Sequence, residues 1–298
     1  MTLRGLKMQV IELNKAGIYI SVKGGFLLVK DGEQTDKIDL DNIDCMIINS
    51  YGASFSNNAL IRLCELNIPL LVCGNNANPI GILQSNTENV YRKTHLTAQL
   101  NASLPLQKNL WQSIIKAKVH NQAALLKSLG QKSDDIALLE KKVTSGDTGN
   151  VEAIAARFYW QRLFGKAFKR DFEQPGINAF LNYCYAILRA SFCRHIAAAG
   201  LLPEAGIHHR NQMNPFCLAD DLMEPYRPFA DALVKSIALI DKIELNPEFK
   251  RQLISVLDTS VAMGENNYHL QFAIQKTVQT LVNSYLQKKC LLEYPVLA

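Results

Sequence analysis

The sequence contains no uninterrupted apolar run that approaches membrane-spanning length. Residues 1–7 lack the apolar core and small-residue cleavage site of a secretory leader. No internal repeat and no low-complexity tract is present. We therefore expect a soluble, cytoplasmic chain with no membrane partner.

Cysteine pairs are missing too. The seven cysteines are odd in number and include no C-x-x-C pair, so neither a zinc site nor a disulfide framework is indicated. Most of them lie in apolar runs, as Cys73 and Cys184 do. We expect buried free thiols in a reducing cytoplasm.

A strong excess of one charge sign is also absent. Lys and Arg number 32 against 27 Asp and Glu, which gives a formal net charge of +5 and a pI of about 8.7. So small an excess barely favours a nucleic-acid partner by itself. With 298 residues, 48% hydrophobic and 20% charged, the chain is typical of a globular protein with one large domain or two smaller ones.

Short apolar runs separated by turn residues predict strands in the first part of the chain. These runs are residues 8–13, 17–22, 26–30, 43–48, 69–73 and 80–83. The dipeptide Asp31-Gly32 predicts a hairpin turn, and Ser56 is a good N-cap for a helix over residues 57–65. We expect a small N-terminal β-sheet domain with one helix over residues 1–86.

From about residue 90, apolar residues recur at helical spacing. Segment 177–196 is apolar around most of its circumference, which predicts a buried central helix. We expect a larger all-α catalytic domain over residues 87–298, and an α+β fold for the chain. The other predicted helices cover residues 110–126 and 133–140, the segment around Glu152 with Thr148 or Asn150 as its cap, and residues 250–261 and 270–286.

A candidate metal site lies in a segment where a helix is predicted to begin at Asn214-Pro215 and to end or bend near Pro225 and Pro228. Asp221 and Glu224 are three residues apart and therefore share a helix face.

The imidazoles of His208 and His209 lie just upstream of these acids. Two carboxylates beside an imidazole can hold a divalent metal ion. Adjacent histidines point in different directions, so at most one of the pair should bind the metal ion.

Ordinary roles stay open for the same residues. Acidic side chains in a first helical turn are common capping groups, and a single histidine is more often packed or solvated than a metal ligand. Arg210 and Arg227 could neutralise Asp221 and Glu224 without any metal ion.

Glu152 is the third candidate acid. An acid early in a helix usually faces water and interacts favourably with the positive end of the helix dipole. Ala153, Ala155 and Ala156 keep its neighbourhood slim, which would let a substrate or another helix approach. Both interpretations of Glu152 stay open from the residues alone.

Basic and aromatic residues are mixed along the helical half, as in Arg157, Phe158, Tyr159 and Trp160. Phosphate binding would need the basic residues to gather on one surface. An ordinary solvated helix face is about as compatible with this pattern.

Three segments resemble a known family, the CRISPR-associated spacer-acquisition endonuclease, which is the integrase of CRISPR adaptation. Residues 151–159 match its Glu in an Ala-rich helix, and residues 206–209 match its Gly-x-x-His. Residues 218–228 match its Leu-Ala-x-Asp-Leu-Met-Glu-x-x-Arg-Pro signature. Residues 208–217 are most similar to the type II branch, and the resemblance covers nearly the whole chain.

The resemblance implies that Glu152, His209 and Glu224 bind Mg²⁺ or Mn²⁺, and the imidazole favours Mn²⁺. Asp221 would be an acidic auxiliary at the catalytic site, and His208 would be a neighbour and not a ligand. The candidate DNA contacts are Arg210, Arg227 and Arg157.

The reaction that the resemblance implies joins the 3′-OH ends of short foreign DNA, the prespacers, to the CRISPR repeat by in-line transesterification. Its implied partners are double-stranded and branched DNA and a second copy of the chain, because transfer at both ends of a repeat needs two active sites. In the family, dimers form through the β domains, and a small ferredoxin-like adaptation partner bridges two dimers. The CRISPR effector nuclease is a further candidate partner.

Two other functions stay open. One is a stand-alone metal-dependent nuclease that acts on branched DNA. The other is a non-catalytic DNA-binding scaffold whose acids only pair with Arg210 and Arg227.

Overall fold

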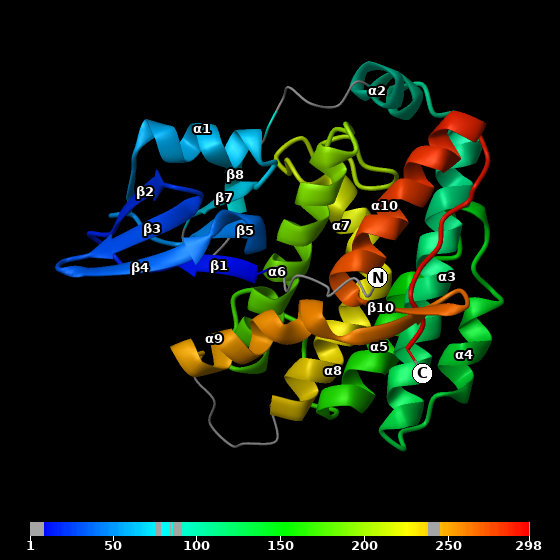
Figure 1. Ribbon diagram of the computed structural model, residues 1–298. Helices are drawn as coiled ribbons and strands as arrows, with labels where there is room; N and C mark the ends of the chain where they lie inside the picture. Colours follow the sequence, from blue (N-terminus) through cyan, green and yellow to red (C-terminus); the bar gives the residue numbers. More distant parts are fainter. Residues whose placement is uncertain (1–8, 75–78, 84, 86–90, 238–244, 298) are drawn as a thin grey trace. The chain divides into compact units, whose positions relative to one another are not determined.

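The computed structural model describes residues 9–74, 79–83, 85, 91–237 and 245–297. The chain divides into two compact units, Met1–Val90 and Tyr91–Ala298, which Figure 1 traces by sequence colour. The predicted boundary between residues 86 and 87 lies outside the described residues, as do residues 1–8.

The first unit contains two four-stranded sheets. Its elements are β1 Gln9–Leu13, β2 Tyr19–Lys23, β3 Phe26–Asp31, β4 Gln34–Asp39, the 3₁₀ turn η1 Leu40–Asn42, β5 Ile43–Ile48, β6 Ser54–Phe55, α1 Asn57–Glu65, β7 Leu70–Cys73 and β8 Pro79–Leu83. One sheet has the order β1-β5-β7-β8, with β1, β5 and β7 parallel and β8 antiparallel to β7. The other has the order β4-β3-β2-β6, in which β6 runs parallel to β2.

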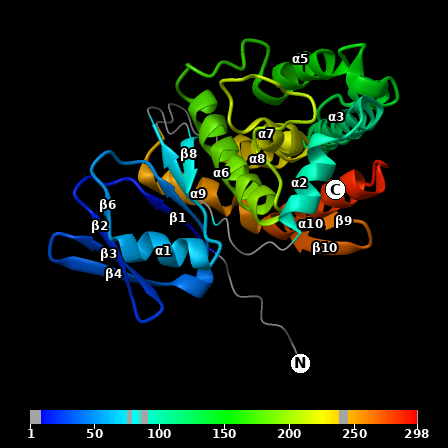
Figure 2. The ribbon, with the colours of Figure 1, turned by 90° about the horizontal axis from the view of Figure 1, so that it is seen from above.

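Both sheets and α1 share one hydrophobic core. The helix lies over β2 and β3 (Figures 1 and 2) and buries Ala59 and Leu63. The Ser56 hydroxyl accepts a hydrogen bond from the Ala59 N–H at 3.1 Å, so the predicted N-cap is confirmed. Fully buried residues that the sheets contribute to this core include Ile20, Leu27, Ile43 and Met46.

The predicted hairpin turn at Asp31-Gly32 is confirmed. It joins β3 to the antiparallel β4, and Gly32 has a φ of +61°, in the left-handed region that glycine tolerates. The sequence pattern does not predict β4, because its residues are polar and mostly exposed. It forms the edge of its sheet, where such residues discourage further pairing.

The second unit is mostly helical. Its elements are α2 Arg92–Leu100, α3 Leu104–Ser128, α4 Asp134–Glu140, η3 Ser145–Asp147, α5 Val151–Phe164, α6 Ile177–Ala198, α7 Cys217–Met223, η4 Glu224–Tyr226, α8 Arg227–Ile237, α9 Pro247–Ile254, η5 Ser255–Asp258, β9 Ser260–Met263, β10 Asn266–His269 and α10 Leu270–Gln287. The predicted buried helix is confirmed as α6, which contacts α7, α8, α9 and α10. Figure 2 shows α7 and α8 between α6 and α3.

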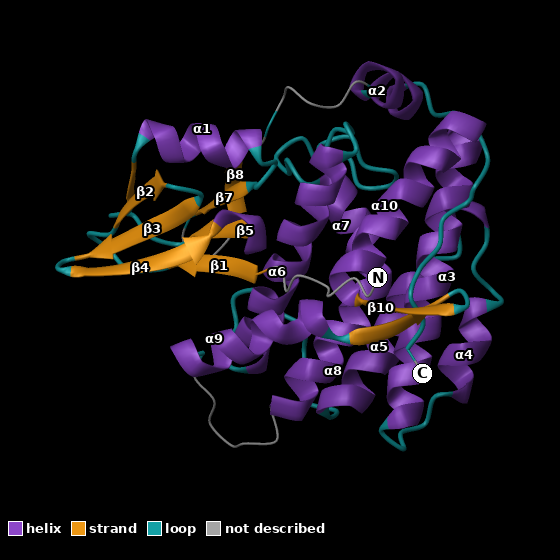
Figure 3. Cartoon of the chain, in the orientation of Figure 1, coloured by secondary structure: helices purple, strands orange, loops and turns teal. Residues whose placement is uncertain are grey.

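The expectation of an all-α second domain is wrong in one place. Strands β9 and β10 form an antiparallel hairpin, drawn in orange among the helices in Figure 3. The helix predicted over residues 250–261 ends at Ile254. Residues Ser260–Met263 bury alternate side chains, a period of two that belongs to a strand but is too short to stand out from a helical pattern.

All seven cysteines are thiols outside any disulfide, and five of them are buried, as expected from their apolar surroundings. Among the described helices, none combines the length and apolarity that a membrane crossing requires.

Candidate active site

The helix that carries Glu152 is capped by a residue that the sequence interpretation did not choose. The Asp147 carboxylate accepts hydrogen bonds from the backbone N–H groups of Val151 and Glu152, each at 3.0 Å. Asn150 has a φ of +51° and makes no side-chain cap, and the Thr148 hydroxyl pairs with that of Thr144, so the predicted capping by Thr148 or Asn150 is wrong. The Asp147 cap fixes the start of α5 and with it the place of Glu152 in the first turn.

Glu152 does not simply face water. Its Oε1 lies 2.6 Å from the Nζ of Lys118, which projects from α3. The Lys118 side chain is only 9% exposed, whereas that of Glu152 is 29% exposed. The alternative of a fully solvated helix-start acid is therefore not what the structure contains.

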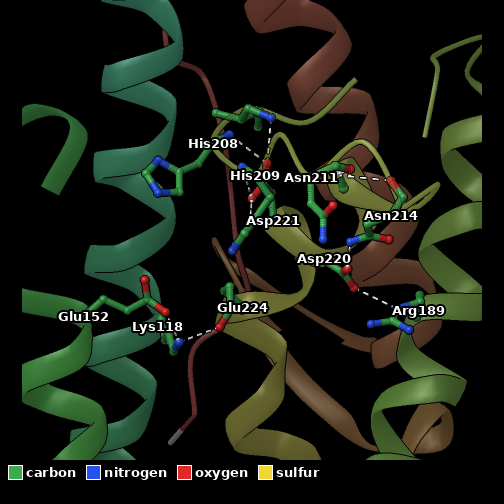
Figure 4. Close-up of polar contacts among 12 residues, drawn as sticks. Lys118, Glu152, Arg189, His208, His209, Asn211, Asn214, Asp220, Asp221 and Glu224 are labelled. Carbon is green, nitrogen blue, oxygen red and sulfur yellow. Dashed lines mark hydrogen bonds and ion pairs between the residues drawn. The ribbon is translucent and has the colours of Figure 1, made fainter. Parts of the chain in front are cut away.

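Glu224 reaches the same ammonium from the other side. Its Oε2 lies 2.5 Å from Lys118 Nζ, and Figure 4 shows the ammonium between the two carboxylates. Pro225 has no N–H to continue α7, and the chain passes into the turn η4 at Glu224. The predicted bend at Pro225 is thus confirmed, and it sets the direction in which Glu224 leaves the helix.

The second oxygen of Glu224 is held by Arg227. Its Oε1 lies 2.8 Å from an Arg227 guanidinium nitrogen, and the Glu224 side chain is 5% exposed. Burial by itself raises the pKa of Glu224, but the charges of Arg227 and Lys118 outweigh burial and the net pKa is lowered. The pKa of Lys118 is raised, because attraction to Glu224 and Glu152 exceeds the opposing effect of its burial. Both partners are therefore charged at neutral pH.

Asp221 lies one turn before Glu224, but its side chain contacts a different part of the chain. It is fully buried, and its Oδ2 accepts hydrogen bonds from the N–H groups of Ile207 at 2.6 Å and His208 at 2.8 Å. Its Oδ1 lies 2.5 Å from the Nδ1 of His209 and 3.3 Å from the His209 backbone nitrogen. One carboxylate thus fastens residues 207–209, here called the histidine segment, to α7.

Gly206 permits this close packing. A Cβ at that position would overlap the His209 carbonyl oxygen and would lie 2.9 Å from Asp221 Oδ2. No side chain fits in that space, so the glycine of the Gly-x-x-His pattern is required here by crowding.

The two histidine rings point in different directions, as the sequence interpretation expects. They are 86° apart, and the His208 ring stacks on Trp111 at 4.2 Å between ring centroids. Because a carboxylate can only accept hydrogen bonds, His209 donates from Nδ1, and in the neutral ring the lone pair is on Nε2. The hydrogen bond to Asp221 raises the pKa of His209 despite partial burial, and attraction to Asp221 and Glu224 adds to the effect.

The three candidate DNA contacts have different surroundings. Arg227 pairs with Glu224 and lies over the ring of Tyr185, with 4.8 Å to the centroid. Arg210 is exposed and donates to the Gln107 side chain at 2.9 Å, so it does not neutralise the acids. Arg157 is exposed on α5. The charge-neutralising alternative therefore holds for Arg227 and fails for Arg210.

These residues fit a hard divalent cation. The carboxylates of Glu152 and Glu224 already converge on one positive charge. The nearby imidazole of His209 is oriented by the carboxylate of Asp221. A histidine that donates one ring N–H to a carboxylate while presenting its other nitrogen is the usual arrangement at metal sites. Within the described part of the chain, however, no three His, Cys, Asp or Glu side chains stand close enough to hold a metal ion as they are.

Lys118 is the site residue that sequence reasoning missed. It follows the apolar residues Ile114 and Ile115 and precedes Val119 on a buried helix face. A lysine at an apolar position of a helical pattern was the only signal, and it does not reveal which acids the ammonium meets.

Asp231 is a second buried acid that the pattern did not reveal. Its Oδ2 accepts from the Tyr159 hydroxyl at 2.6 Å and its Oδ1 from the Tyr185 hydroxyl at 2.5 Å. Burial raises the pKa of Asp231 from 3.8 to about 6, against the effects of the two hydroxyls and of Arg227.

This raised pKa gives a test of the fold. The folded protein binds a proton at Asp231 between pH 3.8 and about 6 that the unfolded chain does not bind, so stability falls as the pH rises through this window. A shift of roughly two pKa units corresponds to about 3 kcal/mol. Asp231→Asn keeps the shape of the side chain without ionising. As the pH rises from about 4 to 7, we expect the free energy of unfolding of this variant to increase by about 3 kcal/mol relative to that of wild type.

Urea unfolding across that pH range measures the difference. Asp134→Asn, at an exposed position in the first turn of α4, is the matched control and should run parallel to wild type. If the stability difference between wild type and Asp231→Asn does not change with pH, Asp231 stays ionised in the folded protein.

Comparison with known families agrees with the resemblance in the motifs. The family model described as CRISPR associated protein Cas1 matches residues 11–260. The chain is 36% identical over 267 residues to "CRISPR-associated endonuclease Cas1" of Neisseria meningitidis serogroup C, with 88% of this chain and 87% of that protein covered. It is 28% identical to "CRISPR-associated endonuclease Cas1 2" of Saccharolobus solfataricus, over 77% of this chain and 75% of that protein.

Solved structures share the fold. A casposase bound to integration product superposes with a TM-score of 0.79 at 23% identity, covering 95% of this chain and 92% of the casposase chain. A CAS1 protein from Thermotoga maritima superposes with a TM-score of 0.75 at 16% identity, covering 94% and 97%. The expected fold, a β-sheet region followed by a mostly helical region, is therefore confirmed.

Proposed function

The chain belongs to the family of CRISPR-associated Cas1 proteins, and from this premise we propose that it is a divalent-metal-dependent DNA endonuclease and strand-transfer integrase. The observation that carries the proposal is the convergence of Glu152 and Glu224 on one cation. His209 supports it, because Asp221 fixes the His209 tautomer and leaves Nε2 available as a ligand.

Glu152, His209 and Glu224 would hold Mg²⁺ or Mn²⁺ at this place. When bound, such an ion neutralises charge that develops on a DNA phosphate and lowers the pKa of an attacking hydroxyl or water. Asp221 would act by positioning His209, because all of its hydrogen bonds go to the histidine segment. Arg227 would keep the Glu224 carboxylate ionised and correctly turned.

The biological reaction would be strand transfer. The 3′-oxygen of a short foreign DNA forms a new bond to phosphorus in the CRISPR repeat, in line with the bond that breaks. The displaced 3′-oxygen of the repeat leaves with a proton, while the attacking hydroxyl loses one to solvent. With water as the attacking group, the same site would cut DNA, and the Neisseria relative is named an endonuclease.

The assembly would follow from the need for two active sites. A homodimer formed through the β domain, residues 1–86, would pair two chains, and a small ferredoxin-like adaptation protein would bridge two such dimers. The CRISPR effector nuclease is a candidate partner for choosing the foreign DNA. Arg157 and Arg210, both exposed, are better placed to meet DNA phosphates than Arg227, which is already paired with Glu224.

A product-length assay tests this function. With Mn²⁺, a labelled short DNA carrying free 3′-OH ends and a repeat-containing duplex, we expect labelled products longer than the short DNA, with a higher yield when the adaptation partner is present. Blocking the 3′ ends with a dideoxy nucleotide should remove these long products and leave cleavage intact. Cleavage without any long product would favour the stand-alone nuclease, and binding without either product would favour the scaffold.

A further inference from the structure

Lys118 occupies the place where the two acids would hold a metal ion. Its Nζ lies 2.6 Å from Glu152 Oε1 and 2.5 Å from Glu224 Oε2. The lysine comes from the interior of α3, with Ile114, Ile115 and Val119 buried around it. The ammonium is therefore fixed by a buried stem and is not a loose surface charge.

The charges at this point balance as they stand. Lys118 and Arg227 carry two positive charges, and Glu152 and Glu224 carry two negative ones. Adding a divalent cation to the same two carboxylates would crowd four positive charges around two negative ones. Repulsion of that kind is strong where water is largely excluded, and Glu224 and Lys118 are both buried.

We propose that the Lys118 ammonium stands in for the divalent cation, holding Glu152 and Glu224 together in the metal-free protein and leaving their oxygens when the metal ion binds. The inference rests on the proposed function, since it places the metal ion on the same carboxylates. Lys118 is then a positioning residue: it keeps the acids assembled, and it competes with the ion for them.

If Lys118 competes with the metal ion, removing its charge should strengthen metal binding, whereas removing a merely structural lysine should not. The metal ion binds only those molecules in which Lys118 has left the two carboxylates. The apparent affinity is therefore the intrinsic affinity multiplied by the fraction of such molecules. Lys118→Met keeps the length of the side chain and removes its charge, so it should bind Mn²⁺ at least about tenfold more tightly than wild type. If Lys118 only supports the fold, its removal should weaken Mn²⁺ binding or leave it unchanged.

The experiment is a Mn²⁺ titration without DNA, in which the electron paramagnetic resonance signal reports free Mn²⁺. Lys116→Met is the matched control, because Lys116 lies half-buried on the same helix two residues away and therefore faces another direction. Tighter binding by Lys118→Met alone supports the inference, and equal or weaker binding overturns it. If wild type and both variants bind no Mn²⁺, the proposed metal site fails and the inference fails with it.

A wild-type measurement covers the case in which Lys118→Met does not fold. In metal-free protein labelled with ¹⁵N-lysine, the Lys118 ammonium should give a resonance protected from water exchange by its two carboxylate partners. Lys118→Arg, which keeps the charge, identifies that resonance by its loss. At Mg²⁺ concentrations that calorimetry shows to be saturating, the resonance should shift or vanish, and a resonance that persists unchanged overturns the inference.

Discussion

Glu152→Gln is expected to lower Mn²⁺-supported DNA cleavage and strand transfer by on the order of 10³-fold. The amide keeps the size of the side chain but removes the negative charge that would hold the metal ion. Because the Glu152 side chain is 29% exposed, this change leaves less uncompensated charge in the interior than the same change at Glu224. Gel-based cleavage and strand-transfer rates, read beside DNA affinity from fluorescence anisotropy, measure the effect.

DNA affinity should stay within about threefold of wild type, since the loss is in transition-state stabilisation and not in uniform binding. Glu140→Gln is the matched control, because Glu140 is partly exposed at the end of α4, where it contacts His120. Rates of Glu152→Gln within about tenfold of wild type would remove Glu152 from the metal site. A parallel loss of DNA binding would instead indicate a structural role.

Asp221→Asn is expected to cost about 3 kcal/mol of folding free energy and to lower the melting temperature by roughly 10 °C. Each oxygen of Asp221 accepts two hydrogen bonds, from Ile207 and His208 at one and from two nitrogens of His209 at the other. Whichever way the amide turns, its NH₂ group faces donors in a fully buried place. Thermal unfolding followed by circular dichroism checks the size of the loss.

The Mn²⁺ affinity of the same variant separates the structural role of this carboxylate from its role in orienting His209. At a temperature where Asp221→Asn is folded, we expect Mn²⁺ affinity to fall a further 10- to 100-fold, roughly the effect of removing the outer partner of a metal-binding histidine. Asp134→Asn, an exposed acid in a first helical turn, should match wild type in both measurements. A melting temperature within about 2 °C of wild type would mean that Asp221 does not hold the histidine segment.

Sequence patterns predicted those parts of the fold that carry a continuous apolar run or a recognisable helix cap. The β5 strand and α1 have the predicted bounds, because an apolar run and a Ser56 cap mark them directly. The edge strand β4 has no apolar run to reveal it, and it forms because β3, its one neighbour in the sheet, supplies the pairing. The hairpin of β9 and β10 interrupts a helical region with only four residues in each strand, below the length at which period and propensity decide.

The sequence predicted which side chains could bind a metal ion, but not how these side chains are arranged in space. Spacing places Asp221 and Glu224 on one helix face, yet the structure sends one to the histidine segment and the other to Lys118. That division depends on the bend at Pro225 and on α3, which approaches only through tertiary packing. Asp147, which caps α5, lies three residues before Asn150, and the left-handed backbone of Asn150 turns the chain between them. Residue type alone does not specify this turn.

Because His208 stacks on Trp111, the fluorescence of Trp111 reports the position of the histidine segment. The chain has two tryptophans, and the indole of Trp111 lies parallel to the His208 imidazole, with 3° between the ring planes. The His209 ring also meets Trp111 edge-on, with 5.7 Å between the ring centroids, so a shift of either histidine changes the surroundings of this indole. With Trp160 replaced by Phe, tryptophan emission, excited at wavelengths where the ten tyrosines do not absorb, would come from Trp111 alone and would follow the position of this segment in real time, free of label, substrate or turnover.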